Sequence, residues 1–399
     1  MKIYKNAAQH CCQAQASSAR FWVCLVLLVY VYVGYPAVAF ALAAVFDRPV
    51  RKRDIQPSVT VLVAAYNEEQ EIERTVLNKL TQDYPPERLD VIVVSDGSTD
   101  RTCAVVQRVA EGSEGRVQLL RQEPRQGKTQ ALNAAIPKAI GEIVVFSDAN
   151  SIYAPDAIRS LVRNFADPSV GYVTGRMIYT NPAESGIGEG SGSYMSYENC
   201  VRIVETRLGS VVGVDGGVDA IRRVLYKPMR PDQLPDFVLP LSVVEQGKRV
   251  VYEPGARVYE SALSDPADEF RMRVRVSLRA LWALYDKRGL LSPMRFPVFA
   301  WQLLSHKLLR YLAFIPLLGL FVFNALAAGH HSFYAWFFAL QLVAYILALL
   351  GHLFRRSSTK SSLFLAPYYF VILNSACFVA FWKFMNGQKM VLWKPRAGA

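Results

Sequence analysis

Long apolar runs stand at both ends of the sequence, and a polar stretch lies between them. The first run, 21–46, contains no charged residue and is more than long enough to cross a hydrocarbon layer of ~30 Å. It exceeds the ~7–15 apolar residues of a cleaved signal peptide and begins too far from the start, so we expect a retained anchor. Later runs of about twenty residues without an internal acid predict membrane spans rather than a buried helical core; they are 308–328, 333–354 and 363–384.

Between these runs, residues 57–262 are polar and punctuated by glycine, which predicts one domain tethered to the membrane at both ends. Residues 1–20 are then an N-terminal tail. Residues 263–307 are expected to form amphipathic helices that lie in the membrane interface. Within the domain, the glycine- and serine-rich run 181–192 predicts a mobile loop, or an ordinary surface linker.

Short β-branched runs in the domain alternate with stretches of helical spacing, which predicts an α/β fold with a mostly parallel sheet. Strands are expected at 59–65, 89–94, 117–120 and 143–146, each followed by a polar turn and a helix. The carboxyl ends of parallel strands meet at one edge, where open α/β sheets bind ligands. The turns should therefore bring together Asn67, Asp96, Lys128 and Asp148.

Asp148 follows the apolar run 143–146, where a carboxylate could hold a divalent ion that bridges to a diphosphate. It could equally cap a helix that begins near Pro155. Three kinds of group would then converge on one edge: Asp96 for a nucleotide base or ribose, Lys128 for a phosphate and Asp148 for a metal. That convergence favours a nucleotide site.

The formal net charge of +12 first suggests nucleic acid, but the basic residues are not interleaved with aromatic residues in a binding stripe. They cluster beside the apolar runs, as at 48–53, 271–288 and 355–360, which suits anionic lipid headgroups. The positive-inside rule then places the domain on the cytoplasmic side of the cell membrane. The six cysteines show neither metal spacing nor a paired framework, which is consistent with a reducing compartment.

Four ordered segments of the domain carry a resemblance to a known family: VAAYNEE, VIVVSDGSTDRT, RQGKTQALNAAI and VVFSDAN. Together with LPDFVLPLSVVEQGKRVVYEP further on, they resemble the family 2 glycosyltransferases, which have the GT-A fold. The likeness covers essentially the whole domain. The flanking runs resemble the spans of membrane polysaccharide synthases and of their non-processive relatives.

The resemblance implies a nucleotide-sugar donor, usually linked to UDP, and a divalent metal. The family's first two turns hold the base and ribose, which here implicates Ala65, Asn67, Glu68 and Asp96. Its DxD motif holds Mg²⁺ or Mn²⁺ on the diphosphate, and here that motif reads Asp148-Ala149-Asn150. The second acid is thus an amide, a legitimate hard-cation ligand without charge, so we expect the metal to bind more weakly.

Family 2 enzymes invert the anomeric centre with a carboxylate base, and Asp236 matches that base although Pro235 replaces the acid before it. Capping of the following helix is the alternative role for Asp236. Processive members carry Gln-x-x-Arg-Trp, of which this chain keeps only Arg275. Arg275 and Lys128 are expected to approach the diphosphate, with a lipid headgroup as the alternative contact for Arg275.

These observations predict an inverting transferase of the cell membrane that delivers a sugar to a saccharide or lipid-linked acceptor. A processive polysaccharide synthase is one alternative, although the stacking tryptophan of its motif is lost. Others are a polyprenyl-phosphate glycosyltransferase and a silent scaffold that binds envelope-assembly proteins. Four spans would put the C-terminal tail outside the cytoplasm, whereas its basic residues, Lys383, Lys389, Lys394 and Arg396, favour the inside. We expect the four-span arrangement.

Overall fold

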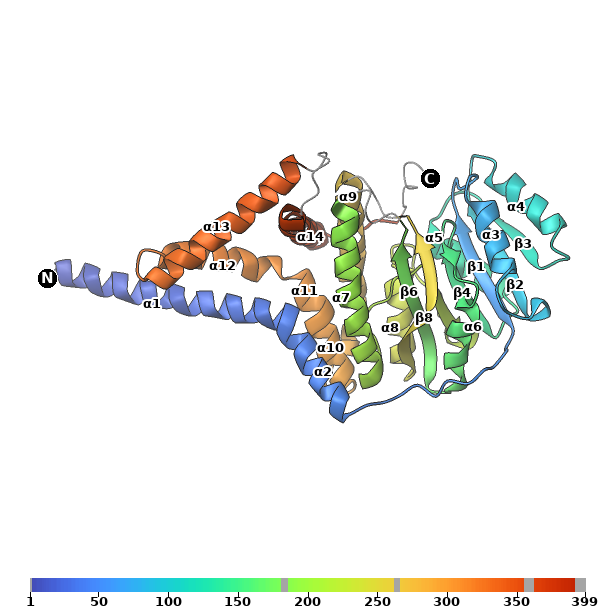
Figure 1. Ribbon diagram of the computed structural model, residues 1–399, viewed down its shortest axis with the longest axis horizontal. Coiled ribbons are helices and arrows are strands. Elements are labelled where there is room, and N and C mark those ends of the chain that lie inside the picture. Colours follow the sequence, from blue (N-terminus) through green and yellow to red (C-terminus); the bar gives the residue numbers. More distant parts are fainter. Residues whose placement is uncertain (1, 181–185, 262–265, 355–361, 392–399) are drawn as a thin grey trace.

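The structure is a computed structural model that describes residues 2–180, 186–261, 266–354 and 362–391 (Figure 1). An α/β domain lies at one end, and long apolar helices extend from it. The domain contains an eight-stranded sheet in the order β3-β2-β1-β4-β7-β6-β8-β5. Its strands are β1 (Val59–Ala65), β2 (Leu89–Asp96), β3 (Val117–Gln122), β4 (Ile143–Asp148), β5 (Ile152–Tyr153), β6 (Val170–Tyr179), β7 (Asp219–Arg222) and β8 (Arg249–Glu260).

Strands β1 to β4 coincide with the four strands expected from the sequence. Strand β1 pairs in parallel with both neighbours, so that Val59 lies opposite Leu89 of β2 and Ile143 of β4. Strand β3 continues the parallel arrangement beyond β2. The other half of the sheet is mixed, because β7 runs antiparallel to both β4 and β6. The carboxyl ends of β1 to β4 therefore share one edge, as predicted.

Helices cover both faces of the sheet, because alternate residues of a strand point to opposite sides. In β1, Val61 and Val63 pack toward α3, α4 and α6, whereas Leu62 and Ala64 pack toward α5 and α8. All four side chains are buried. The helices are α3 (Ile72–Leu80), α4 (Thr102–Glu111), α5 (Lys128–Ala135), α6 (Ala157–Val162) and α8 (Pro235–Glu245), with 3₁₀ turns η2 (Pro86–Arg88), η3 (Ile136–Lys138), η4 (Arg163–Ala166), η6 (Arg223–Leu225) and η7 (Arg288–Leu291).

Helices α7 (Gly186–Leu208) and α9 (Pro266–Asp286) stand between the sheet and the apolar helices (Figure 1). Residues 186–192, expected in a mobile loop, instead begin α7, while residues 181–185 lie outside the described part. The later turns of α7 pack Tyr197 and Val201 against α2 (Tyr35–Val45), and a helix fixed in this way extends readily to preceding residues.

The apolar helices only partly match the expected spans. By length and composition, the described residues contain three candidate spans: Gln15–Val45, Ser332–Leu353 and Leu363–Met385. The first comprises part of α1 (Lys2–Val29), a π-helical turn η1 (Tyr30–Gly34) and α2, and the others lie in α13 (Ser332–Leu353) and α14 (Ser362–Met385). Because α1 begins at Lys2, residues expected to form a tail before the anchor continue its helix.

The expected span 308–328 is not one continuous helix, and the bent pair of helices that contains it qualifies by composition as one broken span. The chain forms α10 (Pro297–Gln302), a π-helical turn η8 (Leu303–Leu308), α11 (Leu309–Tyr311) and α12 (Phe314–Ala327), with a bend of 59° before α12. Pro316 explains the break, because its ring would clash with the carbonyl of Leu312 in a continuous helix. At 14 residues, α12 alone is too short for a ~30 Å layer.

The segment after α14 returns to the α/β domain. Lys389 Nζ lies 2.7 Å from a carboxylate oxygen of Asp232, and Trp282 Nε1 donates to the carbonyl of Gln388 at 2.8 Å. This contact contradicts the expected arrangement with the tail across the membrane from the domain. If α13 and α14 cross the membrane and the bent pair of α10–α11 and α12 does not, the chain crosses twice after the domain. The domain and the segment after α14 then lie on the same side. The basic segments 355–361 and 392–399 lie outside the described residues.

Candidate functional site

The turns after β1 and β2 are hydrogen-bonded to each other. Asn67 has a positive φ of 56°, which asparagine tolerates better than most residues. Its side-chain oxygen accepts from the backbone N–H of Thr99 at 2.8 Å. The backbone N–H of Glu68 donates to Thr102 Oγ1 at 2.8 Å, and Ala65 is buried at the end of β1. Three of the expected nucleotide contacts therefore lie on one fixed pair of turns.

Asp96 connects these turns to the loop before α5. Its carboxylate is fully buried and accepts from Gln122 Nε2 at 2.6 Å and from the backbone N–H groups of Gln126 and Gly127 at 2.8 and 3.0 Å. The guanidinium of Arg125 stacks 3.4 Å from the ring centroid of Tyr66. Asp96 thus fixes the start of α5.

Lys128, the first residue of α5, lies between two carboxylates at the carboxyl edge of the sheet. Its Nζ is 2.6 Å from Asp148 Oδ1 and 3.7 Å from Asp236 Oδ1. Burial alone would lower the pKa of Lys128, but the two carboxylates outweigh it and raise that pKa above its ordinary value. Lys128 is therefore a permanent cation in this cluster, which unites residues more than 100 positions apart.

The turn that carries Asp148 and Asn150 is held from α3. Thr75 Oγ1 donates to the carbonyl of Ala149, and Lys79 Nζ donates to the carbonyl of Ser151, both at 2.6 Å. Lys79 is fully buried, and its burial lowers its pKa well below the ordinary value. The helix expected near Pro155 has Asp156 at its N-cap position, and Asp148 pairs with Lys128 instead. The capping role weighed for Asp148 is therefore wrong.

Asp236 is the second residue of α8, and its capping role is also wrong. The N-cap position belongs to Leu234, whose side chain makes no cap hydrogen bond. The carboxyl of Asp236 rests instead on Gly216, where an added Cβ would come within 2.5 Å of its Cγ. Burial raises the pKa of Asp236, which Asp148 reinforces and the charges of Lys128 and Arg279 oppose. A carboxylate with a raised pKa accepts protons more readily.

Helix α9 contributes a cation that the motif comparison missed. Arg279 donates to the carbonyl of Gln233 and to Thr129 Oγ1, the latter at 3.1 Å, and so ties α9 to the loop before Asp236. Burial lowers the pKa of Arg279 to about 10, and the charge of Arg275 one turn earlier acts in the same direction. The spacing of these two arginines by four residues placed both on one helix face and could have indicated Arg279.

Asp219 is a second residue that sequence reasoning missed. It opens β7, opposite Thr174 of β6 and Phe146 of β4, and is only 1% exposed. Burial raises its pKa to about 7, and the negative charge of Asp236 adds to this effect. A single acid at the start of a four-residue strand gave no periodic pattern that could reveal it.

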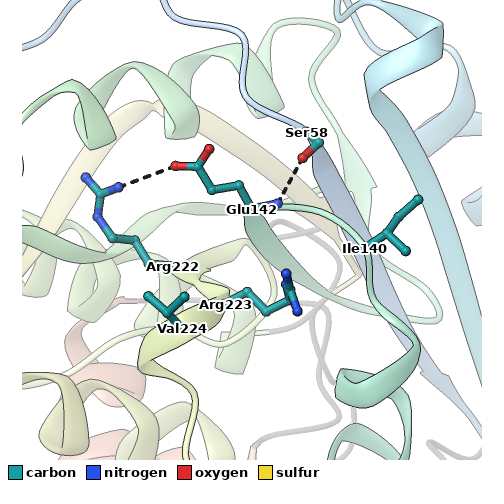
Figure 2. A pocket seen from close by; sticks show the side chains of 6 residues that line it. All are labelled: Ser58, Ile140, Glu142, Arg222, Arg223 and Val224. Carbon is teal, nitrogen blue, oxygen red and sulfur yellow. Dashed lines mark hydrogen bonds and ion pairs between the residues drawn. The ribbon is translucent and has the colours of Figure 1, made fainter.

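A surface cavity of about 230 Å³ lies at the opposite edge of the sheet (Figure 2). It is lined partly by Ser58 and Glu142, which come just before β1 and β4, and by Arg222 and Arg223. Both arginines donate to backbone carbonyls, Arg222 to Val170 and Arg223 to Gly141, each at 2.8 Å. This cavity is therefore separate from the cluster around Lys128.

Part of the chain is similar to known glycosyltransferases. The family described as glycosyl transferase family 2 matches residues 60–228. The beta-monoglucosyldiacylglycerol synthase of Nostoc sp. is 32% identical over 189 residues, which are 46% of this chain and 40% of that protein. The poly-beta-1,6-N-acetyl-D-glucosamine synthase of Staphylococcus aureus is 27% identical over 254 residues, 60% of this chain and 59% of that protein. The matches thus span about half the length of these relatives.

A solved structure resembles the chain over almost all of its length. The mannosyltransferase PcManGT from Pyrobaculum calidifontis, in complex with GDP-Man and Mn²⁺, superposes with a TM-score of 0.72 and 24% sequence identity. The match covers 92% of this chain and 99% of that one. It confirms the GT-A fold.

Proposed function

We propose that this chain, whose residues 60–228 match the glycosyl transferase family 2 model, transfers a sugar from a nucleotide sugar to a saccharide or lipid-linked acceptor at the membrane. One observation carries the proposal. Lys128 sits between Asp148 and Asp236 at the carboxyl edge of the sheet, where open α/β sheets bind their ligands. In this arrangement the cation can stabilise a leaving diphosphate, one carboxylate can hold a metal ion, and the other can take the proton of an attacking hydroxyl.

In the proposal, Ala65, Asn67, Glu68 and Asp96 surround the base and ribose of the donor. UDP is our first choice of nucleotide, from the family resemblance. The GDP-Man in the PcManGT complex makes a guanosine donor the second candidate. Lys128, which lies at this edge, and Arg275, one turn of α9 before Arg279, would face the diphosphate.

The residues present fit a Mg²⁺ or Mn²⁺ ion shared with a diphosphate. The described residues hold no group of three or more histidine, cysteine or acidic side chains that could form a closed metal cage. Such ions are commonly held by only one or two protein oxygens together with substrate phosphates. Asp148 and the amide of Asn150 would supply those oxygens. The ion would neutralise charge that develops on the leaving diphosphate.

The acceptor hydroxyl would attack the anomeric carbon on the face opposite the diphosphate. As the new C–O bond forms and the bond to the diphosphate breaks, the hydroxyl proton passes to Asp236. Partial burial and the raised pKa of Asp236 suit this role. Lys128, which remains charged, would stabilise the departing nucleotide diphosphate.

Two relatives suggest the class of acceptor. The Nostoc enzyme is named for a glycolipid and the Staphylococcus enzyme for a polysaccharide. The long apolar helices would hold either acceptor near the bilayer, with the catalytic domain on the cytoplasmic face. Between the two we favour a lipid-linked acceptor, because the match to the glycolipid enzyme has the higher identity.

A screen of nucleotide sugars with detergent-solubilised protein tests the proposal. Release of the free nucleotide diphosphate should depend on Mg²⁺ or Mn²⁺ and on one donor. A labelled product that extracts into organic solvent identifies a lipid acceptor, whereas a water-soluble polymer identifies a processive synthase. The absence of transfer from every UDP- and GDP-sugar, by protein that is folded, would refute the proposal.

A further inference from the structure

A cluster of buried charged residues joins α7 to the apolar helices. We call it the junction cluster and define it by Glu198, Glu205, His306, Lys307 and Arg310. His306 bridges the two acids, with Nδ1 at 2.7 Å from Glu205 and Nε2 at 3.3 Å from Glu198. Arg310 pairs with Glu198, and Lys307 Nζ lies 3.7 Å from the same carboxylate. Both acids are at most 2% exposed, so neither lies on a solvated face of α7.

The junction cluster holds the segment Val212–Gly216, which follows α7. The carboxylate of Glu205 accepts from the backbone N–H of Val212 at 3.1 Å and also from the hydroxyl of Tyr35 in α2. Lys307 rests on Gly213, where an added Cβ would lie 2.4 Å from its Nζ. Two elements therefore fix the segment. Helix α2 acts through Tyr35 and Glu205, and the turn η8 acts through Lys307.

The far end of this segment meets Asp236. Asp215 forms a bidentate ion pair with Arg202 of α7, which fixes the segment a third time. The next residue, Gly216, has φ +89° and packs against the carboxyl of Asp236 so closely that a Cβ would not fit. A displacement of the segment would consequently move the surface on which Asp236 rests.

Stability does not explain why such a cluster is buried. The mutual attraction of buried ions is largely offset by their lost hydration, and apolar side chains of similar volume often stabilise a fold as well or better. Burial raises the pKa of Glu198, but Arg310, His306 and Lys307 outweigh it and hold that pKa well below its ordinary value. The acid thus stays ionised. Buried ionic groups of this kind can specify one arrangement of their surroundings.

We propose that the junction cluster positions Asp236 through the segment Val212–Gly216, so that the apolar helices and the catalytic carboxylate keep one fixed geometry. This inference rests on the proposed function, in which Asp236 is the base. Lys307 and Glu205 are positioning residues in it and do not touch the substrate. A membrane helix that shifts would thereby alter turnover without altering the donor site.

Lys307→Met tests the inference, because it removes the ammonium but keeps a long apolar stem. We expect kcat to fall by about 10- to 100-fold, since displacing a reacting group by about 1 Å can cost about 10²-fold. The KM and Kd for the donor should remain unchanged, because Asn67 and Asp96 lie on other turns. Lys287→Met is the matched control, as it breaks a partly exposed ion pair with Glu245, and should keep the wild-type kcat. A wild-type kcat in Lys307→Met overturns the inference.

A double variant separates positioning from general destabilisation. If Lys307 acts through Asp236, adding Lys307→Met to Asp236→Asn should change the residual rate by less than about twofold. A further 10- to 100-fold loss would show an independent effect and refute the inference while leaving Asp236 as the base. Wild-type turnover in Asp236→Asn would instead remove the base itself and this inference with it.

If Lys307→Met does not fold, Tyr35→Phe tests the inference in its place. It removes only the hydroxyl that donates to Glu205 and keeps the ring packed on Trp301. A loss of about threefold or more in kcat, with the donor Kd unchanged, supports the inference. An unchanged kcat in folded Tyr35→Phe overturns it.

Discussion

Asp219 should make the protein less stable as the pH rises from 3.8 to about 7. Its carboxyl is buried in the central part of the sheet, and its pKa is raised from 3.8 to about 7. Ionisation of Asp219 is thus easier in the unfolded chain than in the folded protein. The folded state carries no penalty below pH 3.8, an increasing one up to about pH 7, and the full one above that pH.

The difference of about three pKa units corresponds to about 4 kcal/mol, since each unit is worth about 1.4 kcal/mol. Asp219→Asn replaces the acid with a neutral group of nearly the same shape and should remove this penalty. Relative to the wild type, the variant should gain about 4 kcal/mol near pH 8 but only about 2 kcal/mol near pH 5.

Thermal unfolding in detergent, followed between pH 5 and pH 8, measures this dependence. The difference in melting temperature between Asp219→Asn and the wild type should increase steadily with pH. Asp156→Asn is the control, because Asp156 is about half exposed and its loss should have a small effect at every pH. A difference that is constant with pH, or that decreases, would refute the reasoning about Asp219.

Further outcomes follow from the same geometry. Asp148→Ala should abolish metal-dependent donor binding in calorimetry without unfolding the protein, and Asn150→Asp should tighten Mn²⁺ binding; unchanged affinities would remove both residues from the metal site. Gly216→Ala should lower turnover by at least about tenfold in a steady-state assay, because its Cβ would lie 2.5 Å from the carboxyl carbon of Asp236, and wild-type turnover would contradict that contact. A single cysteine at Lys389 should resist an impermeant reagent in intact cells, whereas labelling would place the tail outside.

The parallel half of the fold could be predicted from sequence because its signals are local. Strands β1, β2 and β4 are short β-branched runs closed by polar turns, and parallel pairing then fixes the edge shared by Asn67, Asp96 and Asp148. Strand β7 could not be placed in this way. Its antiparallel position between β4 and β6 depends on contacts with strands distant in the sequence.

The same distinction between local and tertiary signals applies to the candidate site. The turn motifs placed Lys128 and Asp148 at one edge of the sheet, whereas Asp236 was indicated separately, and its position 3.7 Å from Lys128 depends on where tertiary packing places α8. The capping roles weighed for both acids were reasonable from local sequence and are excluded by three-dimensional neighbours. At Pro316 the local signal was present but was not used. Hydropathy alone predicted one span there, whereas the proline breaks the helix.

The turnover of Asp236→Asn, measured beside its donor affinity, tests the central claim most directly. The donor should bind to the variant with the wild-type Kd, because the amide keeps the volume of the carboxylate and the proposed base and ribose contacts are on other turns. Turnover should fall by a factor of ~10² or more, as expected for the loss of a general base. Wild-type turnover, or an equal loss of donor binding and turnover, would contradict the account.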